Sequence, residues 1–179
     1  MPIFLETTRL IINPPAMEEL ENSYMLQSDV DVMEYLGDGV RSKEEVKAWL
    51  QKAVRHQEKY GFSIGSIYEK TSGLFVGRAG LAHLDYDDTQ PLEVAYLLTK
   101  NSWGKGYATE LGQAIIQWAF GNLTFSKLIA HTNSKNVRSR RVLEKIGMRY
   151  VKMTREGDQE VVFYEIQNIA GHIQHTGKE

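Results

Sequence analysis

The stretch Trp103-Gly104-Lys105-Gly106-Tyr107-Ala108-Thr109-Glu110 joins a strand pattern to a helix pattern. Before it, residues 92–98 are expected to form a strand with Leu92, Val94, Tyr96 and Leu98 on one face, and after it apolar residues recur at helical spacing. Glycines at such a junction let the backbone turn tightly and approach a ligand. The free N–H groups of the first helical turn and the helix dipole favour an anion there. The segment predicts either a phosphate cradle or a tight turn without a ligand.

Two familiar phosphate-binding motifs do not fit this segment. A P-loop needs Ser or Thr after its lysine, whereas Gly106 follows Lys105. A dinucleotide fingerprint needs a third Gly or Ala, and Thr109 occupies that position. Nucleoside triphosphate binding of the P-loop type and dinucleotide binding of the Rossmann type are therefore excluded.

The composition suits one globular domain. The 179 residues are 42% hydrophobic and 25% charged, contain no Cys, and carry a net charge of −2. Zero Cys excludes disulfides, thiolate zinc sites and a Cys nucleophile, and the acidic balance argues against nucleic-acid binding by bulk charge. The start of the chain lacks a signal-peptide pattern, and no apolar run approaches the roughly 20 residues that span a bilayer. We expect a cytoplasmic domain over residues 1–167 and a polar tail over 168–179.

The periodicity of the chain predicts a mixed α/β (α+β) fold. A capping-box pattern at Ser42 and Glu45 marks the start of one helix, and a helical pattern begins at Met17. Strands are expected at 8–13, 62–68, 74–84, 92–98, 127–131, 150–154 and 160–166, and further helices after Gly106 and over 139–146.

Five segments in this order resemble the GNAT superfamily of acyl-CoA-dependent N-acyltransferases, most closely its RimJ/RimL-like branch. The resemblance covers about residues 5–166. The segments are Glu6-Thr7-Thr8-Arg9-Leu10, Val76-Gly77-Arg78-Ala79-Gly80-Leu81, Glu93 to Leu98, Trp103 to Glu110, and Asn133 to Met148. Trp103 stands where the family's pyrophosphate loop usually has Arg or Gln.

The resemblance implies a GNAT fold, in which a mixed twisted sheet flanked by helices has central strands that splay apart to admit acetyl-CoA. The implied cofactor-binding residues are Tyr96, Leu97, Leu98, Trp103, Gly104, Lys105, Gly106, Tyr107, Ala108, Thr109, Asn136, Ser139 and Arg141. The first three would pair with the pantetheine, and the loop N–H groups would meet the pyrophosphate. No metal is expected.

Acyl transfer to an amine requires a neutral amine, a donor for the oxyanion and at most a weak acid for the departing thiolate. Glu93 is the candidate catalytic base, or else a solvated edge carboxylate or a member of a structural ion pair, and His83 and Asp85 are its rivals as base. His131 is expected to be a strand-end neighbour of the site rather than a participant.

The thiolate has no tyrosine partner of the kind that the family uses, because Leu143 occupies that position. Ser139 is therefore the candidate hydrogen-bond donor to the sulfur, or simply a residue near a helix N-terminus. Asn136 is expected to bind pantetheine, to cap the helix, or both.

The resulting hypothesis is an N-acetyltransferase that acts by direct attack in a ternary complex. The acceptor is expected to be a protein or peptide N-terminus, a ribosomal protein among them, or a small amine. Glu34, Tyr35 and Asp38 could attract a cationic amine. A homodimer is left open, no membrane or strong nucleic-acid partner is expected, and a non-catalytic acyl-CoA-binding module is the alternative.

Overall fold

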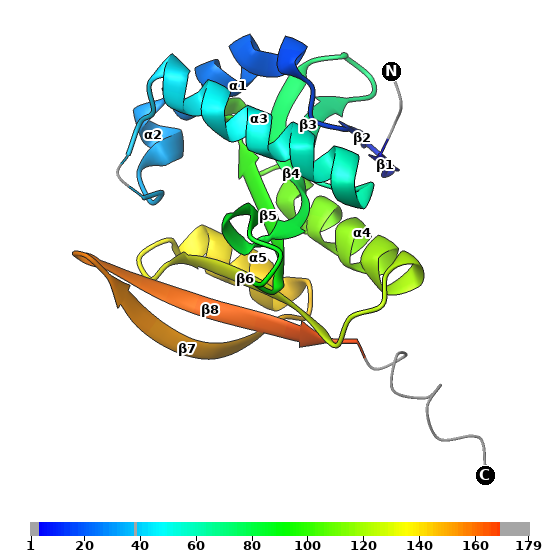
Figure 1. Ribbon diagram of the computed structural model, residues 1–179. Coiled ribbons are helices and arrows are strands. Elements are labelled where there is room, and N and C mark those ends of the chain that lie inside the picture. Colours follow the sequence, from blue (N-terminus) through cyan, green and yellow to red (C-terminus); the bar gives the residue numbers. More distant parts are fainter. Residues whose placement is uncertain (1–3, 38, 169–179) are drawn as a thin grey trace.

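The protein is described by a computed structural model, which covers residues 4–37 and 39–168 (Figure 1). The strands are β1 (Leu5–Glu6), β2 (Leu10–Asn13), β3 (Ile64–Glu69), β4 (Phe75–His83), β5 (Leu92–Leu98), β6 (Lys127–Asn133), β7 (Arg149–Glu156) and β8 (Gln159–Gln167). The helices are α1 (Leu20–Gln27), α2 (Val30–Met33), α3 (Lys43–Tyr60), α4 (Tyr107–Asn122) and α5 (Val137–Lys145). Short 3-10 turns η1 (Met17–Glu19), η2 (Leu84–Tyr86) and η3 (Lys100–Ser102) complete the described elements.

All eight strands form one mixed sheet in the order β1-β2-β3-β4-β5-β6-β8-β7. Neighbouring strands are antiparallel except β5 and β6, which are parallel. The sheet therefore consists of two antiparallel halves that meet at a single parallel junction.

Helices cover both faces of the sheet. Helices α1, α2 and α3 lie on one side, and α4 and α5 lie on the other (Figure 1). The main core packs α4 and α5 against the sheet, and its fully buried members include Leu81, Leu111, Ile115, Leu128 and Leu143. Burial of such side chains contributes roughly 1.5–3 kcal/mol each.

The mixed α/β fold with flanking helices is confirmed. Ser42 and Glu45 form the predicted capping box at the start of α3. The sequence patterns missed β1 and α2, because a strand of two residues and a helix of four residues are too short to show a period. Asn168 is buried and its N–H donates to the Ser126 carbonyl. Asp38 and the rest of the predicted tail, 169–179, lie outside the described residues.

Within the described residues, none of the helices combines the length and apolar character that crossing a bilayer requires.

A histidine pair, buried His56 of α3 and half-buried His83 of β4, joins α3 to the end of β4. His56 Nε2 lies 3.0 Å from His83 Nδ1, and His56 Nδ1 lies 2.8 Å from the Phe62 carbonyl oxygen. Burial lowers the pKa of His56 most, and the neighbouring His83 and Lys59 lower it further, against the opposing effect of the Phe62 carbonyl. Burial likewise lowers the pKa of His83. Both rings therefore fold in the neutral form.

We predict that this pair makes the fold acid-sensitive. A histidine with a pKa of about 6.5 when unfolded and a lower pKa when folded stabilises the protein above pH 6.5, and that stability falls as the pH falls below 6.5. The urea midpoint should drop between pH 7.5 and 5.5, and the drop should be smaller in His56→Gln. His131, whose pKa is shifted upward, is present in both proteins and cancels in the comparison. Equal drops would contradict the assignment.

Candidate active site

Strands β5 and β6 part almost as soon as they meet. They share one register pair, Glu93 with Ile129, whereas β5 pairs with β4 along its whole length from Leu92 to Leu98. The edge of β5 beyond Val94 therefore has no strand partner on the β6 side. This is the splay of central strands that the sequence resemblance implied.

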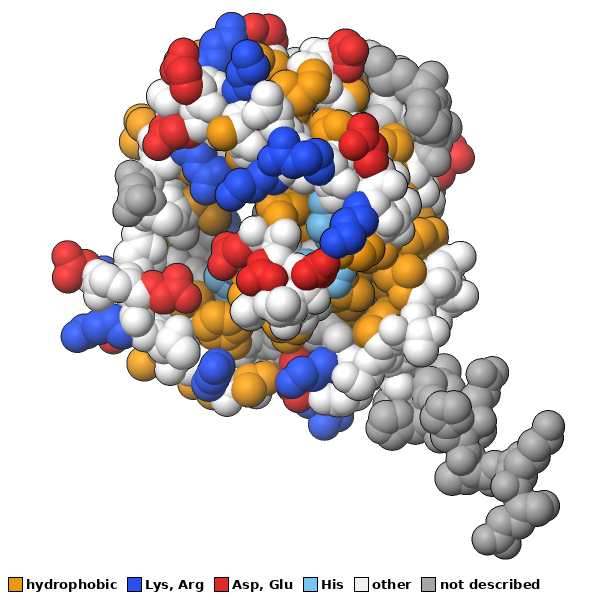
Figure 2. All heavy atoms as spheres, in the orientation of Figure 1, with side chains coloured by type: hydrophobic (Ala, Val, Ile, Leu, Met, Phe, Trp, Pro, Cys, Tyr) orange, Lys and Arg blue, Asp and Glu red, His pale blue; other side chains and the backbone are white. Residues whose placement is uncertain are grey.

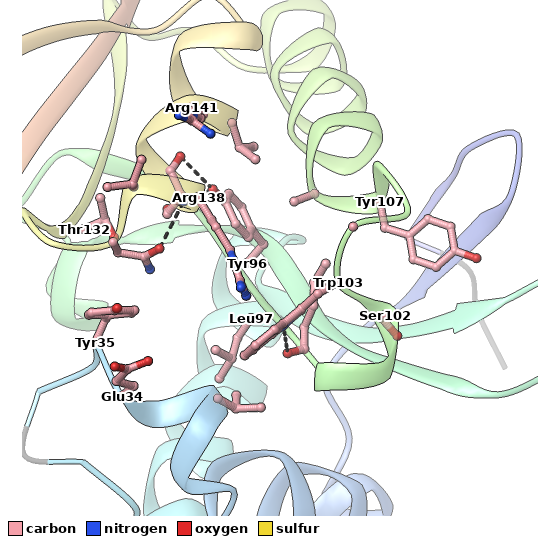
Figure 3. A pocket seen from close by; sticks show the side chains of 18 of the residues that line it. Glu34, Tyr35, Tyr96, Leu97, Ser102, Trp103, Tyr107, Thr132, Arg138 and Arg141 are labelled. Atoms are coloured by element: carbon pink, nitrogen blue, oxygen red, sulfur yellow. Dashed lines mark hydrogen bonds between the residues drawn. The ribbon is translucent and has the colours of Figure 1, made fainter.

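A cleft of about 1320 Å³ opens at this splay. The molecule is hollowed between the helical layer and the β7–β8 hairpin (Figure 2). The wall of the cleft comes from β5, β6, α5, the α4 N-terminus and α2 with the turn after it (Figure 3). A cleft of this volume is large enough to hold a small-molecule ligand.

The glycine segment forms one end of the cleft. Gly106 is the N-cap of α4 with φ of +80°, a left-handed conformation that favours glycine, and no side chain caps the helix. The first N–H groups of α4 are thus left for another acceptor, and Tyr107, Ala108 and Thr109 line the cleft. The ring of Tyr107 points away from the cleft (Figure 3). Its backbone, rather than its hydroxyl, belongs to the site.

The N-terminal strands hold this helix end in place. Glu110 accepts hydrogen bonds from the Thr7 hydroxyl at 2.6 Å, the Arg9 N–H at 2.9 Å and Arg9 Nε at 2.7 Å. Arg9 also donates to the Lys105 carbonyl at 2.8 Å and lies over the Tyr107 ring. These contacts connect β1 and β2 to both sides of Gly106.

A pair of hydroxyl groups lies inside the cleft. Tyr96 Oη, from β5, is 2.9 Å from Ser139 Oγ, from α5. Burial raises the pKa of Tyr96 to about 12, although the Ser139 hydrogen bond opposes this, so the phenol stays protonated at neutral pH. Asn136 Oδ1 accepts from the Ser139 N–H at 3.1 Å, which confirms the predicted cap of α5 and fixes Ser139.

The free edge of β5 carries backbone groups toward the cleft. The Thr99 N–H donates to the Val76 carbonyl on β4, so the alternation of a strand directs the N–H and C=O of Leu98 and Tyr96 to the opposite side. Trp103 Nε1 donates to the Leu98 carbonyl at 3.0 Å, which fits this direction (Figure 3). The backbone here can pair with an extended ligand.

Charges differ between the two ends of the cleft. Helix α5 contributes cations, and the Arg138 guanidinium lies 5.0 Å above the Trp103 ring. The basic residues that line the cleft from α5 and its approach are Lys135, Arg138, Arg141 and Lys145. The α2 side contributes Glu34 and Tyr35, which lie across the cleft from Arg141 (Figure 3).

Glu93 and His131 form an ion pair at the base of the splay. Glu93 Oε1 lies 2.6 Å from His131 Nδ1, and the side chains are 14% and 33% exposed, respectively. Nδ1 is buried, and the Glu93 carboxylate is the polar group beside it. Burial lowers the pKa of His131, but Glu93, followed by Glu156 and Asp85, outweighs burial and raises it overall.

The structure brings most of the predicted site together. Every predicted site residue lines the cleft except Lys105, which lies over the Tyr107 ring instead, and Glu93, which lies behind His131. His83 and Asp85 are not among the lining residues, and Leu143 is buried in the core. Sequence reasoning missed the Tyr96 side chain, whose hydroxyl supplies a phenol that the sequence lacks at position 143.

Comparisons with known proteins agree with this architecture. The family model of the acetyltransferase (GNAT) domain matches residues 9–149. YkkB of Bacillus subtilis (strain 168) is 32% identical over 141 residues, which are 79% of this chain and 81% of YkkB. A GNAT-family acetyltransferase from Bacillus anthracis superposes with a TM-score of 0.78 at 24% identity, covering 93% of this chain and 99% of that one.

The chain belongs to the GNAT acetyltransferases, which are acyl-CoA-dependent enzymes. The ribosomal L7/L12 α-N-protein acetyltransferase RimL, solved with coenzyme A, has a TM-score of 0.76 and 14% identity, covering 93% of this chain and 98% of RimL. At that identity RimL shares the fold, and its substrate is a property of RimL.

We predict that Arg9→Ala lowers the stability of the domain, because Arg9 holds the α4 end of the cleft in place. The variant loses two hydrogen bonds from its side chain, one of them to a carboxylate that is mostly buried. We expect a loss of about 1–2 kcal/mol in the free energy of unfolding, measured with urea. Lys59→Ala, which removes an exposed ion pair with Asp88, is the control and should lower the free energy of unfolding less than Arg9→Ala does. Equal losses would argue against a special role for Arg9.

Proposed function

We propose that this protein transfers the acetyl group of acetyl-CoA to a primary amine by direct attack in a ternary complex. The observation that carries the proposal is the cleft at the β5–β6 splay, with an uncapped helix N-terminus at one end and an acidic side chain at the other. The CoA pyrophosphate suits the first end, and a cationic amine suits the second.

The N–H groups from Trp103 to Thr109 would hold the pyrophosphate, and the pantetheine would lie along residues 96–98 and pair with the free backbone groups of Tyr96 and Leu98, since those of Leu97 face β4. Asn136 would contact the pantetheine amides besides capping α5. Arg138 and Arg141 are the cations available to the 3′-phosphate, because Arg140 is occupied by Tyr164 and the Ser134 carbonyl. When acetyl-CoA is bound, it supplies a thioester carbonyl for attack.

The hydroxyl pair of Tyr96 and Ser139 would serve the departing thiolate. A thiolate with a pKa of roughly 8.5 needs a hydrogen-bond donor rather than a strong acid. Tyr96 keeps its proton at neutral pH, and its 2.9 Å contact lets Ser139 donate in turn. The Leu98 N–H would donate to the oxyanion of the tetrahedral intermediate.

The acceptor would enter beside α2. Asp31 lines the cleft but is paired with Lys100. Glu34 has no ion-pair partner among the described residues, so its charge is free to attract an ammonium group. A peptide N-terminus, including that of a ribosomal protein, and a small amine both meet this requirement.

We predict that Gly106→Glu lowers CoA affinity at least tenfold in calorimetry, because it places a carboxylate beside the N–H groups of α4. Gly61→Glu is a matched control, since Gly61 caps α3 with a φ of +78° and has open space around it. Both variants carry the same charge and similar strain, so only the location differs. Equal affinities in the two variants would contradict the placement of CoA.

An acceptor screen tests the activity itself. We expect thiol release from acetyl-CoA with at least one member of a panel of N-terminal peptides, polyamines and other primary amines. Glu34→Gln should raise the acceptor KM several-fold without changing CoA affinity, whereas Glu58→Gln, on the exposed side of α3, should change neither. Tight CoA binding without turnover on any amine would instead favour a non-catalytic acyl-CoA-binding module.

A further inference from the structure

We propose that His131 is the group that accepts the proton from the attacking amine, and that Glu93 is a positioning residue behind it. The proposal rests on the proposed function, because it assigns a role within the same acetyl transfer. It departs from the expectation that Glu93 takes the proton itself and that His131 is a bystander.

The position of the two side chains favours the histidine. His131 lines the cleft, together with Tyr35, Leu97 and Thr132, whereas Glu93 is not among the lining residues. The Glu93 side chain is 14% exposed against 33% for His131, and its carboxylate contacts the buried Nδ1 of the ring. A base must lie within hydrogen-bond reach of the proton it takes, directly or through one water.

The two ring nitrogens of His131 have different surroundings. Nδ1 is buried against Glu93, and Nε2 has no hydrogen-bond partner among the described residues. The carboxylate favours the tautomer with its proton on Nδ1, which leaves the lone pair on Nε2. With a third of the side chain exposed, Nε2 is the nitrogen that can meet an amine in the cleft.

The rest of the environment holds the ring in one orientation. Phe163 of β8 stacks on the imidazole with centroids 5.4 Å apart and rings 24° from parallel. Glu156 of β7 and Asp85 of η2 add negative charge, and Lys152 of β7 lies on Phe163. Burial lowers the pKa of His131, but these negative neighbours outweigh burial and raise it above its usual value, which strengthens the ring as a base.

The step balances without another reactant. The amine enters the step neutral, after its ammonium form has lost one proton to solvent. His131 Nε2 takes the second proton from the nitrogen as the nitrogen lone pair forms the C–N bond to the acetyl carbonyl. The C–S bond then breaks, its electron pair stays on sulfur, and the thiolate takes a proton from the Tyr96–Ser139 pair. Solvent carries a proton from the imidazolium back to that hydroxyl pair, and the products are the acetylated amine and free CoA.

The test combines rate profiles with a titration of the ring. We would measure kcat against pH for two acceptors of different amine pKa, because a limb common to both belongs to the enzyme. His131→Asn keeps a donor near Glu93 but has no base, so kcat at neutral pH should fall at least tenfold and the common limb should vanish, with CoA affinity unchanged. In Glu93→Gln the limb should persist, shifted to lower pH.

Nuclear magnetic resonance of the ring nitrogens checks the pair without turnover. The titration midpoint of His131 in the free protein should move to lower pH in Glu93→Gln. Glu165→Gln is the matched control, because Glu165 is a carboxylate of the same sheet that pairs with Lys127, and it should move neither the midpoint nor the rate profile.

Two results would overturn the assignment. One is a normal rate and limb in His131→Asn; if Glu93→Gln then lost the limb, Glu93 would be the base. The other is an unshifted His131 midpoint in Glu93→Gln. Absence of acetyl transfer by the unaltered protein would instead contradict the proposed function. The ring titration would still test whether Glu93 shifts the pKa of His131.

Discussion

The separation of β5 from β6 after a single residue pair is the constraint on which the site depends. A strand that stays paired on both edges has no backbone groups to offer, and a strand that loses one partner exposes a row of N–H and C=O groups. Here the other edge of β5 remains paired with β4 over its full length. The pairing with β4 therefore holds the free edge of β5 rigidly in place.

Holding the cleft open requires that both flanking helices begin at fixed points. Helix α4 is fixed by the carboxylate of Glu110, which receives donors from Thr7 and Arg9. Helix α5 is fixed by Asn136, which caps it through the Ser139 N–H. These contacts join the N-terminal segment that carries Thr7 and Arg9 to the glycine segment. About a hundred residues separate the two segments in the sequence.

The sequence patterns predicted the elements that are long enough to have a period and the motifs that are local. The capping box at Ser42 and the glycine turn before α4 need only neighbouring residues, so they could be read directly. The Tyr96–Ser139 contact joins positions 43 residues apart. Neither its distance nor its geometry is encoded in any local pattern, and the same holds for the contact of Glu93 with His131.

The burial of a side chain is a second property that local sequence patterns do not reveal. Glu93 was recognised as the acidic residue of an apolar strand, and that signal is equally strong for a carboxylate in the cleft and one behind it. The structure separates the two cases, because the register of Glu93 with Ile129 places His131 one strand repeat further on, on the same face. A single strand spacing thus separates the side chain that lines the cleft from the one that does not.

Successive side chains of β5 point to opposite faces of the sheet, so the group suited to accept a proton and the group suited to keep one lie on different faces. Glu93 and Leu97 lie on the face of β5 toward α1–α3, with His131 beside Glu93, and Tyr96 lies on the other face with Ser139 of α5. Negative neighbours raise the pKa of His131 and suit it to accept a proton, whereas burial raises the pKa of Tyr96 to about 12 and suits it to keep one. Amine activation and thiolate capture would call for these two behaviours, and the splay of β5 from β6 leaves the two side chains lining one cleft from opposite faces of the sheet.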